Sequence, residues 1–360
     1  MSKKFVHRRK NFVGKRPTAS QEVRRPSKGQ RSMSYSISEA LEIFILAKEA
    51  EGVRERTIKD YRSHIRYLCD FVGKILDTDT PEKAEISVID ADLIRRYINY
   101  LRTEKNAYSG VTGRETEGRR ISVSTINIRL RTLRTMCRFW AEEGILPDNP
   151  MKNIRPLRED EVEEVPGISD DDLSRILAHC DETTFAGFRD RVLILLMIDT
   201  GLRPYEATTL TIDRIDEKAG IIIVPSEIAK NRKWREVPIS REVVRELLQL
   251  YEESQQYFGD TDGRIFMNAY GDPFTDDSFR KRLSRIRKKL GIDRLHPNQF
   301  RHTFARKYLL NGGDLFSLQR ILDHANIQTT RKYVQMDTSD LIMQHNRYSP
   351  AKKYVRKRQY

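Results

Sequence analysis

The chain has 360 residues, of which 38% are hydrophobic and 33% charged, so it can form two domains with buried cores and a well-solvated surface. It contains no run of 18 apolar residues, and its basic N-terminus lacks the apolar segment of a secretory signal. We therefore expect a cytoplasmic protein with no membrane partner. Its three cysteines, Cys69, Cys137 and Cys180, stand far apart among apolar neighbours, which favours buried reduced thiols over a disulfide scaffold or a zinc site.

The formal net charge of +14 is concentrated at the two ends of the chain. Residues 1–32 carry +10 and residues 349–360 carry +5, which leaves −1 for the residues between them. We interpret 1–32 as a basic, disordered tail that either contacts a polyanion or stays solvated, and 349–360 as a second basic tail. If the folded part binds nucleic acid, its basic residues must be gathered on one surface.

Residues 33–150 are predicted to form a small helical domain of four helices. Ser36-x-x-Glu39 has the spacing of a capping box at the start of the first helix. A second helix is expected from Thr57 and a third after Asp90.

The fourth helix of this domain has two contrasting faces. Apolar residues recur on one face every three or four positions, namely Ile126, Leu130, Leu133, Cys137 and Trp140. The other side carries four arginines with no acidic residue among them, namely Arg129, Arg131, Arg134 and Arg138. Guanidinium groups match phosphate oxygens in shape and charge, so we expect contacts with DNA phosphates, the alternative being an ordinary solvated face.

A linker and a second domain follow. Residues 151–168 have little periodicity and an acidic cluster, which is typical of a linker. The second domain is expected over 169–348, because Ser169 can cap a helix with acids in its first turn. Further helices are expected over about 241–253 and 277–290.

The middle of this domain contains a sharp corner. An apolar helix that includes residues 192–198 is expected to end at Gly201, and Pro204 suits the first turn of the next helix. Arg203 is thereby predicted to lie at a helix start.

A hairpin is expected next. Residues 220–224 and 234–239 have the composition of strands, and the turn between them carries Lys230 and Lys233. These are the two strands that the sequence predicts.

The stretch from Asn298 to Tyr333 is the most informative one. Arg301 lies in a helical pattern, His324 follows a second apolar helix 23 residues later, and Tyr333 comes nine residues after that. This ordered set closely resembles the C-terminal signature of the tyrosine recombinase (phage integrase) family. The resemblance extends over about residues 35–345, with every segment in the family's order.

The resemblance implies a catalytic site for cutting and rejoining DNA. In this reading Tyr333 is the nucleophile that forms a 3′-phosphotyrosyl intermediate, and Lys230 is preferred over Lys233 as the general acid. The remaining positions that match the family are Arg203 and Arg301 as the two catalytic arginines, Glu206 as the acidic companion of Arg203, and His324 as the second histidine-type position. Two arginines can stabilise the negative charge that develops on the phosphate, so we expect neither a metal nor a cofactor.

Asn298 departs from the family pattern, which usually has histidine three residues before the arginine that corresponds to Arg301. Asparagine can hydrogen-bond a phosphate oxygen but cannot take up a proton near neutral pH. We therefore expect retained but slower catalysis, with Asn298 still part of the site. His296 is a weaker candidate for the missing role.

The fold that the resemblance implies is mainly α with a small β-sheet, an α+β arrangement. It comprises an N-terminal SAM-like four-helix core-binding domain and a C-terminal catalytic domain. The expected function is a site-specific recombinase of the integrase or transposase type, acting as a homotetramer on two double-stranded DNA sites, with accessory recombination proteins as further candidate partners. The alternatives are a DNA-binding regulator weakened in catalysis, for which Asn298 is the hint, and an enzyme similar to type IB topoisomerases.

Overall fold

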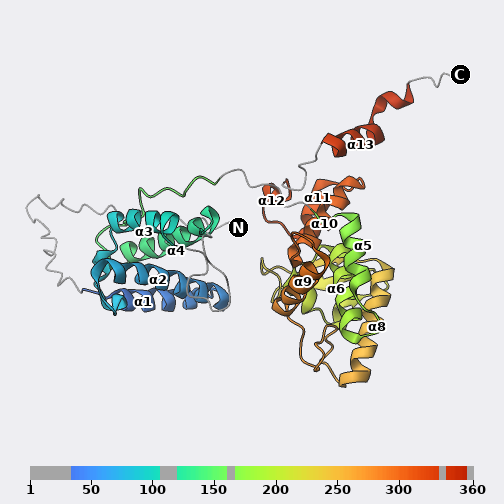
Figure 1. Cartoon of the computed structure of the whole chain (residues 1–360), viewed down its shortest axis with the longest axis horizontal. Coiled ribbons are helices and arrows are strands. Elements are labelled where there is room, and N and C mark those ends of the chain that lie inside the picture. The colour runs from blue at the N-terminus through green and yellow to red at the C-terminus, as the bar shows by residue number, and fades with distance from the viewer. Residues whose placement is uncertain (1–33, 106–119, 160–166, 332–337, 355–360) are drawn as a thin grey trace, which may run out of the picture. The chain divides into compact units, whose positions relative to one another are not determined.

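The computed structural model describes residues 34–105, 120–159, 167–331 and 338–354, and Figure 1 shows the course of the chain. The chain divides into two compact units between Val162 and Glu163, inside the predicted linker, and each unit is described by itself. The predicted tail 1–32 lies outside the described residues. Among the helices of the described residues, none combines the length and the apolar composition that a membrane span requires.

The first unit is a helical bundle (Figure 1). Its described residues form the helices α1 (Ile37–Ala50), α2 (Glu55–Leu76), α3 (Ala91–Thr103) and α4 (Val123–Glu142), with 3-10 turns at Pro81–Lys83 and Ile86–Val88. The four predicted helices are therefore confirmed.

Aromatic side chains fill the centre of this bundle. Trp140 of α4 and Phe44 of α1 are both fully buried, with their rings edge to face at a centroid distance of 6.5 Å. The indole N–H of Trp140 donates to the carbonyl oxygen of Ala40 at 2.8 Å, so this large side chain is buried without losing its hydrogen bond.

The predicted helix starts of the first unit are partly correct. Ser36 and Glu39 form the capping box, and the Asp90 carboxylate accepts from the backbone N–H of Leu93 at 2.7 Å. The prediction that α2 starts from Thr57 is wrong, because α2 already begins at Glu55. An acidic residue in the first turn interacts favourably with the positive end of the helix dipole, which favours the earlier start.

The first part of the predicted linker packs against α4. The Asn127 amide donates to the carbonyl of Leu157 at 3.0 Å and accepts from its N–H at 2.9 Å. Met151 and Ile154 are buried in the core of the same unit. Residues 151–157 are thus held to the first unit.

The second unit is built around the buried helix α6 (Phe185–Thr200) (Figure 1). Residues 192–194, 196 and 197 are completely buried, which explains why the segment is apolar on all sides. The other helices are α5 (Asp170–His179), α7 (Pro204–Thr208), α8 (Arg241–Phe258), α9 (Asp276–Leu290), α10 (Pro297–Leu310), α11 (Leu315–Leu322), α12 (Ile327–Arg331) and α13 (Thr338–Tyr348), with 3-10 turns at Ile212–Arg214 and Pro350–Lys353. Helices α8 and α10 pack against α6.

A small antiparallel sheet completes the second unit. Its strands are β1 (Ile215–Asp216), β2 (Ile221–Val224) and β3 (Arg235–Pro238), in that order. Ile222 pairs with Val237, and both face the core. The sequence predicted β2 and β3 but missed β1, because a strand of two residues is too short to show an alternating pattern. The predicted class, mainly α with a small sheet, is confirmed.

The three cysteines are free and buried, as predicted. Burial raises the pKa of Cys69 to about 11 and those of Cys137 and Cys180 to about 12. Such thiols stay protonated near neutral pH and are poor nucleophiles.

Candidate active site

The corner between α6 and α7 positions the first predicted arginine. α6 ends at Gly201, whose φ of +63° lies in the left-handed region that favours glycine. A Cβ atom there would stand 2.4 Å from Cδ1 of Phe304 and 2.8 Å from Cδ2 of Leu322. Pro204 occupies the first turn of α7 and Arg203 is its N-cap residue, as predicted.

The buried carboxylate of Glu206 binds the guanidinium of Arg203. This carboxylate is only 2% exposed, and it accepts from Nη1 of Arg203 at 3.0 Å and from Nη2 of Arg235 at 2.7 Å. Burial raises the pKa of Glu206, but the hydrogen bonds and charges of Arg235 and Arg203 outweigh it and hold the pKa below the ordinary 4.5. The carboxylate is therefore ionised and fully paired.

Arg235 was not among the predicted site residues. It lies on β3 two positions before the buried Val237, so the alternation of a strand places both side chains on the same face. An arginine on the buried face of a strand needs an acidic partner, and this was the available signal.

The second predicted arginine, Arg301, is 5% exposed in α10. Its Nη1 donates to the carbonyl oxygen of Gly201 at 2.6 Å, and its Nη2 donates to that of Leu322 at 2.6 Å. Nη2 also lies 3.0 Å from Nε2 of His324. One guanidinium thus fixes the α6 corner and the end of α11 relative to each other.

His324 is held in one tautomer. A guanidinium can only donate, so Nε2 of His324 must be the acceptor of the Arg301 bond. Nδ1 then carries the proton and donates to Oγ1 of the buried Thr330 at 2.9 Å. Burial, followed by the charges of Arg301 and Arg203, lowers the pKa of His324 to about 4, so the imidazole is neutral at neutral pH.

Asp323, which directly precedes His324 and contacts Arg203, was also not among the predicted site residues. It is the C-cap residue of α11, with φ 52° and ψ 52°. Its main-chain oxygen accepts from Nη2 of Arg203 at 3.1 Å and from Nδ2 of Asn231 at 3.0 Å. Its carboxylate Oδ2 lies 3.0 Å from the same Asn231 nitrogen and 3.4 Å from Nη1 of Arg203. Asp323 thereby connects α7, the β2–β3 turn and α11.

The remaining predicted catalytic residues are exposed or lie outside the described residues. Lys230 and Lys233 are both exposed on the β2–β3 turn. Asn298 is exposed in the first turn of α10, one helical turn before Arg301, so the two lie on one side of the helix. Tyr333 lies outside the described residues, and α12 ends two residues before it.

His296, the weaker candidate for the role of Asn298, is the N-cap residue of α10. Its backbone N–H donates to the side-chain oxygen of Gln299 at 2.9 Å. Burial and the charge of Arg294 lower the pKa of His296. These contacts give His296 a role in starting the helix that carries Arg301.

The four arginines of α4 have different surroundings in the first unit. Arg131 and Arg138 are exposed. Arg129 lies over the ring of Tyr67, with its guanidinium carbon 4.1 Å from the ring centre, and Nη2 of Arg134 donates to the carbonyl of Ile154 at 2.7 Å. Arg138 also lies 3.9 Å from the Glu142 carboxylate, so Arg131 is the member of this set most available to phosphates.

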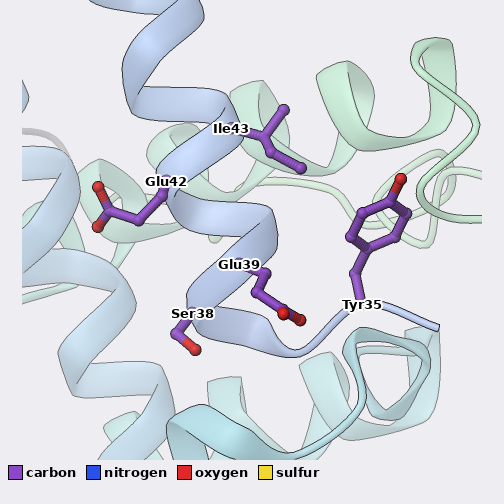
Figure 2. A pocket seen from close by; sticks show the side chains of 5 residues that line it. All are labelled: Tyr35, Ser38, Glu39, Glu42 and Ile43. Atoms are coloured by element: carbon purple, nitrogen blue, oxygen red, sulfur yellow. The ribbon is translucent and has the colours of Figure 1, made fainter. Parts of the chain in front are cut away.

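A surface hollow of the first unit is lined by none of the predicted catalytic or DNA-binding residues. Figure 2 shows its lining side chains, which come from α1 and the residues before it. Of its two carboxylates, that of Glu39 caps α1 and that of Glu42 pairs with Arg62. Among the described residues of the chain, no cluster of three or more histidine, cysteine or acidic side chains is arranged to hold a metal ion.

Comparison with known proteins agrees with this fold. The model of the phage integrase family matches residues 167–340, and that of the phage integrase SAM-like domain matches residues 37–156. Tyrosine recombinase XerC of Serratia marcescens is 30% identical over 231 residues, which cover 64% of this chain and 74% of XerC. Tyrosine recombinase XerD of Listeria innocua serovar 6a is 27% identical over 315 residues, which cover 84% of this chain and 95% of XerD.

Solved structures show the same fold. The integrase of transposon Tn1549, in complex with a circular intermediate DNA, superposes with a TM-score of 0.64 at 18% identity, over 87% of this chain and 100% of that chain. The XerH site-specific recombinase bound to a palindromic difH substrate gives a TM-score of 0.62 at 20% identity, over 88% and 85% of the two chains.

The fold and the sequence relatives together define a site-specific recombinase, an enzyme that cuts and rejoins DNA strands. The chain belongs to the phage integrase family, the family of the tyrosine recombinases. The resemblance seen in the sequence is thereby confirmed.

Proposed function

We propose that this recombinase cleaves duplex DNA by attack of Tyr333 on a phosphodiester, with Arg203 and Arg301 binding the reacting phosphate. The observation that carries the proposal is that both guanidiniums converge on residues 322–324. Arg203 bonds the main chain of Asp323, and Arg301 bonds Leu322 and His324. Two cations fixed side by side suit the negative charge that develops on the non-bridging oxygens.

In the proposed step, the Tyr333 oxygen forms a bond to phosphorus while the bond from phosphorus to the 5′ oxygen breaks. The tyrosine loses its proton to solvent, and Lys230 gives a proton to the departing 5′ oxygen. The 3′-phosphotyrosyl intermediate keeps the phosphodiester bond energy, so attack by a 5′ hydroxyl rejoins a strand by the reverse steps.

The pKa of about 4 limits the role of His324. At neutral pH this imidazole is uncharged, so it acts in the proposal as a neutral partner that orients Arg301. Asn298 takes the place of a group that could titrate, and in the proposal it hydrogen-bonds the phosphate.

The assembly and the biological role are part of the same proposal. We infer a homotetramer on two duplex DNA sites, because exchange of strands between two duplexes requires four cleavage events. The basic residues 1–32 support a mobile-element integrase or transposase, since a tail of charge +10 adds attraction to DNA. A cytoplasmic location follows if cellular DNA is the substrate.

Covalent trapping tests the proposal. A nicked suicide duplex that carries the end of the protein's own element is incubated with the wild type and with Tyr333→Phe. We expect a protease-sensitive protein–DNA adduct with the wild type only. Binding without an adduct from the wild type would instead support a DNA-binding regulator, and Asn298→His would then be the next variant to measure.

A further inference from the structure

The backbone conformation of Asp323 calls for an explanation. Left-handed φ and ψ values of 52° cost a residue other than glycine about 1 kcal/mol or more. Such a conformation persists where surrounding contacts hold it. For Asp323 these contacts include both hydrogen bonds from the Asn231 amide, one to the main-chain oxygen and one to the carboxylate.

Asn231 directly follows Lys230 in the chain, and 92 positions separate it from Asp323. The turn also bonds to itself, through Ala229 N–H to the carbonyl of Pro225 and Arg232 N–H to that of Ala229. These bonds shape the turn, but the amide of Asn231 ties it to the residue before His324.

The two hydrogen bonds from the Asn231 amide to Asp323 depend on the position of the β2–β3 turn. Both distances are 3.0 Å, so a small shift of the turn would lengthen both bonds together. Lys230 is exposed and has four rotatable bonds, so its reach depends on where the backbone of the turn is held.

We propose that Asn231 is a positioning residue for the general acid: with Asp323 it forms a clip that holds the Lys230 turn against the Asp323–His324 corner. The clip rests on the proposed function, in which Lys230 protonates the departing 5′ oxygen. Because the clip acts on one proton transfer, its loss slows expulsion of the leaving group and leaves phosphate binding by the arginines in place.

The test compares two suicide substrates in single-turnover cleavage. One has the ordinary 5′ oxygen at the scissile bond, and the other has sulfur in that bridging position. A thiolate is a far weaker base than an alkoxide and leaves without a general acid, so the sulfur substrate bypasses Lys230. The variants are Asn231→Ala and Lys230→Ala, and Glu227→Gln, an exposed position on the same turn, is the matched control.

On the oxygen substrate we expect cleavage by Lys230→Ala to fall about a hundredfold and cleavage by Asn231→Ala about tenfold, since a general acid contributes at least about a hundredfold. On the sulfur substrate both variants should cleave within about twofold of the wild type. Asp323→Gly suits the left-handed backbone and keeps the main-chain acceptor of the Asn231 bond. Its cleavage of the oxygen substrate should therefore fall less than that of Asn231→Ala, and the sulfur substrate should restore it.

Two outcomes of Asn231→Ala would overturn the clip: an equal loss on both substrates, or no loss on the oxygen substrate. Failure of the sulfur substrate to rescue Lys230→Ala would overturn both the clip and the assignment of Lys230 as the general acid. Failure of cleavage by Tyr333 looks different again, because the wild type would then form no adduct with either substrate. Thermal unfolding and DNA affinity of each variant distinguish a displaced turn from a misfolded protein.

Discussion

Nη2 of Arg301 donates to Nε2 of His324 at 3.0 Å, so two of the residues predicted for the site are directly bonded to each other. The bond determines the tautomer of the histidine, because a guanidinium has no acceptor. It also keeps the imidazole neutral, since a proton on Nε2 would face a positive charge. The chemistry of His324 is therefore set by its partner and by burial.

Thr330 should matter because it accepts the proton of Nδ1 in that tautomer. Thr330→Val keeps the shape of the side chain but leaves a half-buried N–H without its acceptor, a cost of about 1–3 kcal/mol. We expect single-turnover cleavage to slow by about tenfold with little change in DNA affinity. The neighbouring Thr329 is exposed, so Thr329→Val is the control. Equal effects of the two substitutions would contradict the role of Thr330.

The lowered pKa of His324 predicts a pH dependence of stability. The folded pKa is about 4 and the ordinary value is 6.5, so between these values the unfolded chain binds more protons than the folded one. Stability should therefore fall as the pH drops from about 7.5 towards 4, and His324 should contribute almost no slope above about pH 8. The measurement is Tm against pH for the wild type and His324→Gln. Identical slopes below pH 6.5 would contradict the assigned pKa.

Glu206 should be required for the stability of the second unit. Glu206→Ala leaves Arg203 and the largely buried Arg235 without their shared carboxylate. Breaking a buried pair costs about 3–5 kcal/mol, and we expect a loss of this size in the free energy of unfolding from urea titration. Glu236→Gln, an exposed position on β3 next to Arg235, should be neutral. A Glu206→Ala protein of normal stability would show that the Asp323 carboxylate, 3.4 Å from Arg203 and 3.9 Å from Arg235, compensates for the lost pairing.

Gly201 and Gly291 form a matched pair for the α6 corner. Both are left-handed helix C-caps, with φ of +63° and +68°, but a Cβ at Gly291 meets no atom within 4 Å. Gly291→Ala should cost about 1 kcal/mol from its backbone conformation alone. Gly201→Ala should cost about 1–3 kcal/mol more, because its Cβ collides with Phe304 and Leu322. Calorimetric unfolding compares them, and equal losses would argue against a tightly packed corner.

The arginines of α4 should separate into two groups in DNA binding. Arg131→Gln should weaken binding to all sequences alike and reduce the salt dependence by about one unit of slope. Arg134→Gln should mainly lower the stability of the first unit, because it removes the hydrogen bond to the Ile154 carbonyl. Fluorescence anisotropy over a range of salt, with urea unfolding of the same variants, checks both. A change in salt slope from Arg134→Gln alone would reverse this assignment.

Much of the fold could be predicted from local patterns. Ser36 and Ser169 cap their helices as expected, because capping needs only the side chain and backbone of one turn. The corner at Gly201 and Pro204 was predictable for the same reason. The early start of α2 and the two-residue strand β1 were not, since neither leaves a periodic signal.

The sequence by itself determined the family and the identities of the candidate catalytic residues, because residue type and spacing along the chain carry that information. Only the tertiary structure decided how these residues are arranged in space. The pairing of Arg235 with Glu206, the bond between Arg301 and His324, and the contact of Asn231 with Asp323 join positions 29, 23 and 92 residues apart. The pKa of His324 depends on burial and on the charges of Arg301 and Arg203, which are close in space but far away in the sequence. Such properties arise from distances in space, and no local pattern in a chain records them.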